Sequence, residues 1–84
     1  MNVTVRLFAI LRERAGAAEL RLDLGQRATV ATARDALGER VPSIREYLPR
    51  VAWAVNRSYA SVETELRDGD ELAAIPAVSG GRSR

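Results

Sequence analysis

The sequence contains no cysteine, no histidine and no lysine among its 84 residues. Without a thiol or an imidazole, the chain cannot build a cysteine nucleophile, a histidine general base or a Cys/His zinc site. The missing lysine also excludes a catalytic side-chain amine. Serine and threonine hydroxyls therefore have no base to activate them, and we expect no catalytic residues and no bound metal or cofactor in this chain.

Long apolar runs and disulfides are missing as well. No stretch approaches the ~20 apolar residues that a membrane-spanning helix needs. Met1 leads directly into alternating residues, where a secretory signal would have a charged region followed by an apolar one. The lack of disulfides fits a reducing compartment, so we expect a cytoplasmic protein without a membrane segment.

The basic excess is confined to one end of the chain. The pI is about 9.9, but without Arg82 and Arg84 the remaining arginines equal the 11 acidic residues in number. A single-stranded nucleic-acid surface alternates aromatic and basic side chains. The four aromatic residues do not follow that pattern, and they are Phe8, Tyr47, Trp53 and Tyr59. We therefore expect no nucleic-acid partner.

Periodicity predicts two strands near the start of the chain. Apolar and polar residues alternate over 2–8 and again over 19–24, which is the pattern of half-buried strands. A short helical turn over 9–16 connects them and ends at Gly16. We expect the two strands to pair antiparallel.

A helical period follows. Thr29 can cap a helix over 29–40, and the apolar positions of that helix fall on one stripe made of Val30, Ala33, Leu37 and Val41. Gly38 should weaken its last turn, and Pro42 should end it. The segment 42–49 has apolar residues one turn apart, which indicates a short amphipathic piece under the edge of a sheet.

The second half predicts three further strands. They cover 51–55, a short edge segment within 56–61, and 71–75, which Pro76 terminates; Asp68-Gly69 is a strong turn signal before the last one. The fold class is therefore α+β, with a mixed sheet of about five strands and one main helix across one face. Its small size favours a ubiquitin-like roll over 1–76 with a C-terminal tail over 77–84, but the pattern does not determine the strand order.

Two features carry candidate functions. The first is an acidic segment with a local net charge of minus four, formed by Glu63, Glu65, Asp68, Asp70 and Glu71 against Arg67. It is either a docking surface for a basic partner or a solvated turn. The second is Gly80-Gly81, whose lack of side chains lets a chain pass a narrow tunnel. Residues 76–81 extended would span roughly 20 Å, so this tail is either a substrate arm or a solubilising extension.

Three segments in this order and spacing resemble a known family. They are "VRLFAILRERAG" (5–16), "AVNRSYA" (54–60) and "LRDGDELAAIPAVSGG" (66–81), and they are similar to the small subunit of molybdopterin synthase. That family is related to the sulfur carrier of thiamine synthesis. The resemblance implies a ubiquitin-like β-grasp fold and a sulfur carrier rather than an enzyme acting alone.

The family resemblance also implies a reaction sequence and partners. An ATP-using enzyme would adenylate a C-terminal glycine carboxylate, and sulfur transfer would convert it to a thiocarboxylate. The large synthase subunit, in a heterotetramer with two carriers, would transfer this sulfur to cyclic pyranopterin monophosphate in molybdenum cofactor synthesis. Here Gly81 would bear the sulfur and Gly80 would give the tail free passage. The expected partner contacts are Phe8, Ile75, Pro76, Val78 and Ser79, with a place in the core as the alternative for Phe8 and Ile75.

The last three residues depart from the family pattern. Gly81 is held in a peptide bond by Arg82-Ser83-Arg84, whereas an acyl-adenylate must form on a terminal carboxylate. We expect a protease to remove residues 82–84, and an inactive paralogue is the alternative. A sulfur carrier for thiamine or another pathway and a ubiquitin-like modifier or adaptor remain open as other functions.

Overall fold

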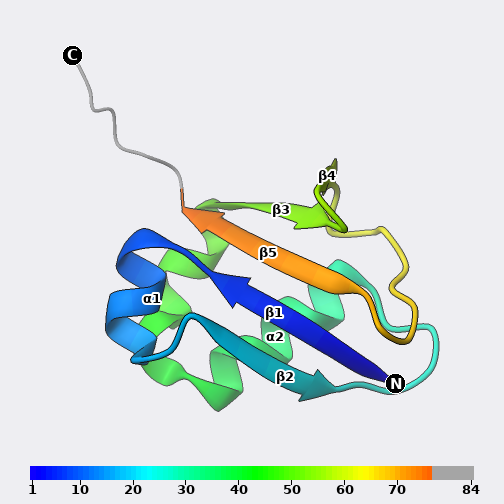
Figure 1. Ribbon diagram of the computed structural model, residues 1–84, viewed down its shortest axis with the longest axis horizontal. Helices are drawn as coiled ribbons and strands as arrows, with labels where there is room; N and C mark the ends of the chain where they lie inside the picture. The colour runs from blue at the N-terminus through cyan, green and yellow to red at the C-terminus, as the bar shows by residue number, and fades with distance from the viewer. Residues whose placement is uncertain (77–84) are drawn as a thin grey trace.

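The computed structural model describes residues 1–76, and Figure 1 shows one twisted sheet with helices packed behind it. The elements in chain order are β1 (Asn2–Leu7), α1 (Ala9–Ala15), β2 (Glu19–Asp23), α2 (Val30–Arg40), the 3-10 helix η1 (Pro42–Arg50), β3 (Val51–Val55), β4 (Ser58–Ala60) and β5 (Glu71–Pro76). Within this part of the chain, no helix combines the length and the apolar character that crossing a bilayer requires.

The five strands form one sheet in the order β2-β1-β5-β3-β4. The first two strands pair antiparallel, as the sequence predicts, and β5 runs parallel to β1 and antiparallel to β3. The last strand of the chain therefore lies in the middle of the sheet, between the first strand and the β3–β4 hairpin. The predicted mixed sheet with one main helix across it is confirmed.

The core lies between the sheet and the α2–η1 layer (Figure 1). Strand alternation sends Val3, Val5 and Leu7 to this side, where each is at most 2% exposed. On the helix side, the predicted stripe is fully buried at Val30, Ala33 and Leu37. Val41 is half-buried and forms the C-cap of α2, so it lies at the edge of the core.

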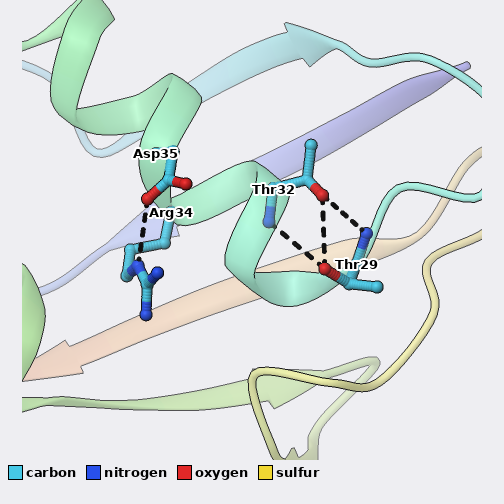
Figure 2. Close-up of polar contacts among 4 residues, drawn as sticks. All are labelled: Thr29, Thr32, Arg34 and Asp35. Atoms are coloured by element: carbon cyan, nitrogen blue, oxygen red, sulfur yellow. Dashed lines mark hydrogen bonds and ion pairs between the residues drawn. The ribbon is translucent and has the colours of Figure 1, made fainter.

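The start of α2 is fixed by a pair of threonines. The backbone N–H of Thr32 donates to Oγ1 of Thr29 at 3.3 Å, and the backbone N–H of Thr29 donates to Oγ1 of Thr32 at 3.1 Å (Figure 2). This reciprocal arrangement is a capping box, in which Thr32 takes the place usually filled by Glu or Gln. It satisfies backbone N–H groups that the first turn of a helix leaves without partners.

Gly38 lies where α2 packs against η1. It is buried, and a Cβ at this position would lie in ordinary contact, 3.4 Å from Cδ1 of Leu48 and 3.6 Å from Cγ of Arg45. On its side of this contact, η1 buries Ile44 and Leu48. This confirms the predicted amphipathic piece after Pro42.

The first strand is one residue shorter than the pattern predicts. β1 ends at Leu7, and Phe8 is the extended N-cap of α1. The next residue, Ala9, has a φ of 52°, so the chain turns sharply there and brings the buried Leu11 under the sheet. The alternation of apolar and polar residues alone cannot predict this turn, because the turn results from the positive φ of Ala9.

The segment from 61 to 70 connects β4 to β5 without a long element of its own. It is held to the start of α2 by backbone hydrogen bonds from Val30 N–H to the Thr64 carbonyl and from Leu66 N–H to the Ala28 carbonyl. Leu66 is 4% exposed and anchors the segment in the core. The predicted turn at 68–69 is confirmed, with a φ of 87° at Gly69.

Candidate functional site

The sheet face opposite α2 is not covered by a helix within residues 1–76 (Figure 1). Backbone pairing aligns four residues across it, because Arg6 lies opposite Ala73, Ala73 opposite Ala54, and Ala54 opposite Tyr59. Residues directly opposite each other point to the same face of a sheet. The row therefore runs from an arginine across two small side chains to an aromatic ring.

These small residues create a groove of about 390 Å³ on the open face. Ala54 is 6% exposed and lies at its floor, whereas Tyr59 is 79% exposed and Phe8 is 38% exposed. The groove therefore has an apolar interior with charged groups around it. Its lining residues are Arg6, Phe8, Ala54, Arg57, Tyr59, Glu71, Ala73 and Ile75.

Arg6 is held between two neighbours on this face. Its guanidinium carbon lies 6.0 Å from the centroid of the Phe8 ring, within the range of a cation–π contact. Its Nη1 also lies 3.4 Å from Oε2 of Glu71. An exposed ion pair contributes little stability. Arg6 thus lies between the Phe8 ring and the Glu71 carboxylate beside the groove.

The β3–β4 turn brings a second arginine to the groove. Asn56 and Arg57 have φ values of 48° and 73°, as a two-residue type I′ hairpin requires. The Asn56 side chain ties this turn to β5: its Nδ2 donates to Oδ1 of Asp70 at 2.9 Å, and its Oδ1 accepts from the Glu71 N–H at 3.0 Å. Arg57 thus projects from a turn that is anchored to the central strand.

The end of β5 lies beside the same groove. Ile75 pairs with Ala52, and Pro76 pairs with Val51. Ile75 is half-buried and lines the groove, and it is not part of the core cluster. The structure therefore brings Phe8 and Ile75 together on one face, with Pro76 next in the chain.

The remaining predicted site residues are not covered by this structure. Val78, Ser79, Gly80 and Gly81 lie outside the described residues, as does the whole predicted tail over 77–84. Their roles stay predictions. The structure contributes the position from which the chain continues, at the end of β5 next to the groove.

The acidic segment is engaged mainly within the molecule. Oδ1 of Asp68 accepts the Asn2 N–H at 2.7 Å, and Oδ2 of Asp70 accepts the Arg67 N–H at 2.7 Å. Glu71 pairs with Arg6, as described above. For Asp68 and Asp70 the structure favours the role of a turn over that of a docking surface, whereas Glu71 belongs to β5 and lines the groove.

A second groove, of about 520 Å³, lies on the helical side between α2 and η1. Its walls are largely charged, and Nε of Arg34 lies 3.3 Å from Oδ1 of Asp35 (Figure 2). Arg45 donates from Nη2 to the Gly38 carbonyl at 3.2 Å. This groove has no aromatic residue among its lining residues and lies away from the end of β5, in contrast to the groove on the open face.

The sequence also matches a family model. The model of the ThiS family covers residues 5–81, which include the span from β1 to the two glycines. The chain belongs to the ThiS family. The matched residues include β5 and continue to Gly80-Gly81.

Curated relatives place the chain more narrowly within the ThiS family. The molybdopterin synthase sulfur carrier subunit of Mycobacterium tuberculosis is 47% identical over 47 residues, which cover 56% of this chain and 57% of that protein. The protein of the same name from Arabidopsis thaliana is 35% identical over 81 residues, covering 96% of this chain and 84% of that protein. The resemblance to molybdopterin synthase small subunits is confirmed.

Solved structures of ThiS-like proteins confirm the β-grasp fold. SAMP1 from Haloferax volcanii has a TM-score of 0.89 at 32% identity, over 96% of this chain and all of that chain. A putative molybdopterin converting factor subunit 1 from Pyrococcus furiosus gives 0.83 at 31%, over 93% and 99%. The complex of subunits 1 and 2 of molybdopterin-converting factor from Helicobacter pylori gives 0.69 at 26%, over 96% and 100%.

Sequence reasoning assigned no site role to five residues of the groove in this ThiS-family chain, namely Arg6, Ala54, Arg57, Tyr59 and Ala73. A signal existed for Arg6, because it shares the parity of Phe8 along β1. Residues 56–61 are predicted as a turn into a short edge segment, but the sequence does not indicate a type I′ turn at Arg57, since the usual second residue of that turn is glycine. Without the type of the turn, the position of Tyr59 opposite Ala54 could not be predicted.

Proposed function

We propose that this chain is the sulfur-carrying small subunit of a molybdopterin synthase and that Gly81 bears the transferred sulfur. The observation that carries the proposal is the ThiS-family match extending to residue 81 from a central strand that ends beside an apolar groove. The named relatives support the pathway. The lack of cysteine, histidine and lysine supports a carrier whose chemistry is supplied by partners.

The proposed chemistry takes place at one carboxyl group. An activating enzyme joins the Gly81 carboxylate to the AMP part of ATP and releases pyrophosphate. A sulfide equivalent from a sulfur donor then attacks the acyl carbon, a C–S bond forms, and AMP leaves, which gives a thiocarboxylate. Transfer of this sulfur to cyclic pyranopterin monophosphate, with water supplying the oxygen, restores the carboxylate. Glycine suits this position because no Cβ obstructs the acyl carbon.

The proposed partner of the groove is the large synthase subunit. Support comes from the Helicobacter pylori relative, which forms a complex of subunits 1 and 2 of molybdopterin-converting factor. An aromatic side chain at the edge of an apolar hollow is a typical anchor of protein interfaces. Docking at Phe8 and Ile75 would direct the residues after Pro76 into the partner, and two carriers would serve one heterotetramer.

This mechanism requires a free carboxylate at Gly81. In the 84-residue sequence that carboxyl is in a peptide bond to Arg82. We therefore propose that a protease removes Arg82, Ser83 and Arg84 before activation. In this scheme the protease and then the adenylating enzyme act on the carrier before it binds the large subunit.

Intact-mass spectrometry tests the proposal directly. A chain that ends at Gly81, the full chain and a Gly81→Ala chain ending at residue 81 are each incubated with the activating enzyme, ATP and a sulfur donor. We expect only the chain ending at Gly81 to gain the mass difference between sulfur and oxygen efficiently. The same chain should then lose that mass when the large subunit and the pterin substrate are added.

Two controls make the result decisive. Omission of ATP should abolish the mass gain, because the carboxylate is then not activated. Circular dichroism should show the same fold for the Gly81→Ala chain, since position 81 lies beyond β5. Equal sulfur loading of this variant, or failure of the loaded chain to convert the pterin, would contradict the assigned role of Gly81 or the pathway, respectively.

A protein modifier is the second candidate, because small archaeal modifier protein 1 of Haloferax volcanii shares the fold at 30% identity and a TM-score of 0.86. In that case the activated Gly81 would form an amide with a lysine of another protein. The chain itself offers no lysine as an acceptor. Branched Gly-Gly remnants on lysines of other proteins, together with no conversion of the pterin, would favour the modifier.

A further inference from the structure

The β3–β4 turn contains a residue that is unusual for its geometry. Type I′ turns need positive φ at both central positions, and Asn-Gly is the favoured pair. Asn56 fits the first position, but Arg57 occupies the second with a φ of 73°. A residue with a Cβ is strained in this region, whereas glycine is not. The arginine therefore lowers the stability of a turn that glycine would form more easily.

The side chain of Arg57 lines the groove on the open face. Two arginines and one carboxylate surround that groove, and the carboxylate of Glu71 pairs with Arg6 at 3.4 Å. Within residues 1–76, no acidic side chain lies within ion-pair distance of Arg57. The rim thus has one positive charge that the described part of the molecule does not balance.

Together these observations point to a ligand for the guanidinium. We propose that Arg57 binds a carboxylate of the docked large subunit, next to an apolar side chain of that subunit seated between Phe8 and Tyr59. The inference rests on the proposed function, in which the large subunit occupies the groove. It adds the chemistry of the contact. The partner presents an acidic residue beside an apolar one, and the strained Arg57 binds the acidic residue. Arginine suits this role because its planar fork can hold a carboxylate with two hydrogen bonds.

Arg27 provides a matched comparison within the same chain. It is also exposed and also has a positive φ, of 63°, but it does not line the groove. Backbone strain by itself therefore does not mark a binding residue here. Position relative to the groove distinguishes the two arginines, and glycine substitutions at both separate the effect on folding from the effect on docking.

The experiment compares Arg57→Gly and Arg27→Gly in the full chain. Thermal unfolding should show Tm values equal to or a few degrees above that of the unsubstituted protein for both variants, because each relieves a strained φ. Calorimetric titration with the large synthase subunit of the same organism should give an unchanged Kd for Arg27→Gly. For Arg57→Gly we expect a Kd at least about 10-fold weaker, since a charge-assisted contact is lost.

Arg57→Met keeps an unbranched side chain with a Cβ at this position and removes the charge. It should weaken binding about as much as Arg57→Gly without the gain in Tm. The affinity of the unsubstituted chain should also fall as the NaCl concentration rises, more steeply than that of Arg57→Met. These two measurements assign the lost affinity to the guanidinium charge rather than to the shape of the turn.

Each unexpected result of these measurements would contradict a different claim. If Arg57→Gly and Arg57→Met bind as tightly as the unsubstituted chain while Phe8→Ala loses affinity, the groove is the docking site but Arg57 does not hold a carboxylate. If neither the unsubstituted full chain nor the same chain ending at Gly81 binds the large subunit, the proposed function itself is overturned, and this inference with it. A Tm loss in Arg57→Gly would show that the arginine stabilises the turn, contrary to the strain argument.

Discussion

Asp70 connects two turns outside the core. Its carboxylate accepts the Arg67 N–H at 2.7 Å and the Asn56 side-chain amide at 2.9 Å. It therefore closes the turn before β5 and fixes the hairpin that presents Arg57. Hydrogen bonds to a charged acceptor contribute more than neutral ones, which makes this half-buried residue a structural one.

We expect Asp70→Ala to lower the free energy of unfolding by about 1 to 2 kcal/mol, because two charge-assisted hydrogen bonds are lost near the surface. Urea unfolding followed by circular dichroism measures the change. Asp35→Ala is the control, since Asp35 only pairs with its neighbour Arg34 on the surface, and it should change stability by less than about 0.5 kcal/mol. Equal effects of the two substitutions would show that the contacts of Asp70 do not stabilise the turn.

Among the secondary-structure elements, the stability of helix α2 depends on the capping of its first turn. Thr29 and Thr32 satisfy each other's backbone N–H groups, and Val30 follows at once as a fully buried residue (Figure 2). Thr29→Ala should therefore destabilise the protein by about 1 kcal/mol. Thr29→Asn should restore most of that loss, because asparagine is an equally good N-cap. Thermal unfolding of the three proteins tests this, and no difference between Ala and Asn would rule out capping as the cause.

Structural features that depend on neighbouring residues could be predicted from the sequence, whereas features that depend on contacts between distant segments could not. Alternation gave β1 and β2, and a cap with an apolar stripe gave α2, because these signals lie within a few neighbouring residues. The placement of β5 between β1 and β3 depends on pairing across the whole chain. The contact between Gly38 and Leu48 has a non-local cause as well, since the two residues belong to different elements.

The candidate site shows the same limit. Phe8 and Ile75 were predicted from the family resemblance, and the structure brings them to one groove. Arg57 and Tyr59 come to that groove only through the β3–β4 hairpin. The sequence does not indicate the type I′ turn of this hairpin, because the turn lacks the glycine that is usual at its second position. The residues 77–81, on which the sulfur chemistry depends, were identified from sequence and stay predictions.

The whole molecule separates a helical side that buries the core from an open side with exposed apolar groups. Among the described residues, three large hydrophobic side chains are exposed, namely Phe8, Tyr59 and Val62. Phe8 and Tyr59 line the groove, whereas Val62 belongs to the segment after β4. Exposed apolar side chains that gather at a hollow indicate a docking surface, while a single one needs no explanation.

This division predicts how substitutions affect docking. Tyr59 is 79% exposed, so Tyr59→Ala should change the free energy of unfolding by about 1 kcal/mol or less, through the lower strand propensity of alanine. It should nevertheless weaken the Kd for the large subunit at least about 10-fold, because aromatic anchors contribute strongly to interfaces. Val62→Ala removes exposed apolar surface away from the groove and should leave that Kd unchanged. If both variants bind as the unsubstituted chain does, the open face is not the surface on which the partner docks.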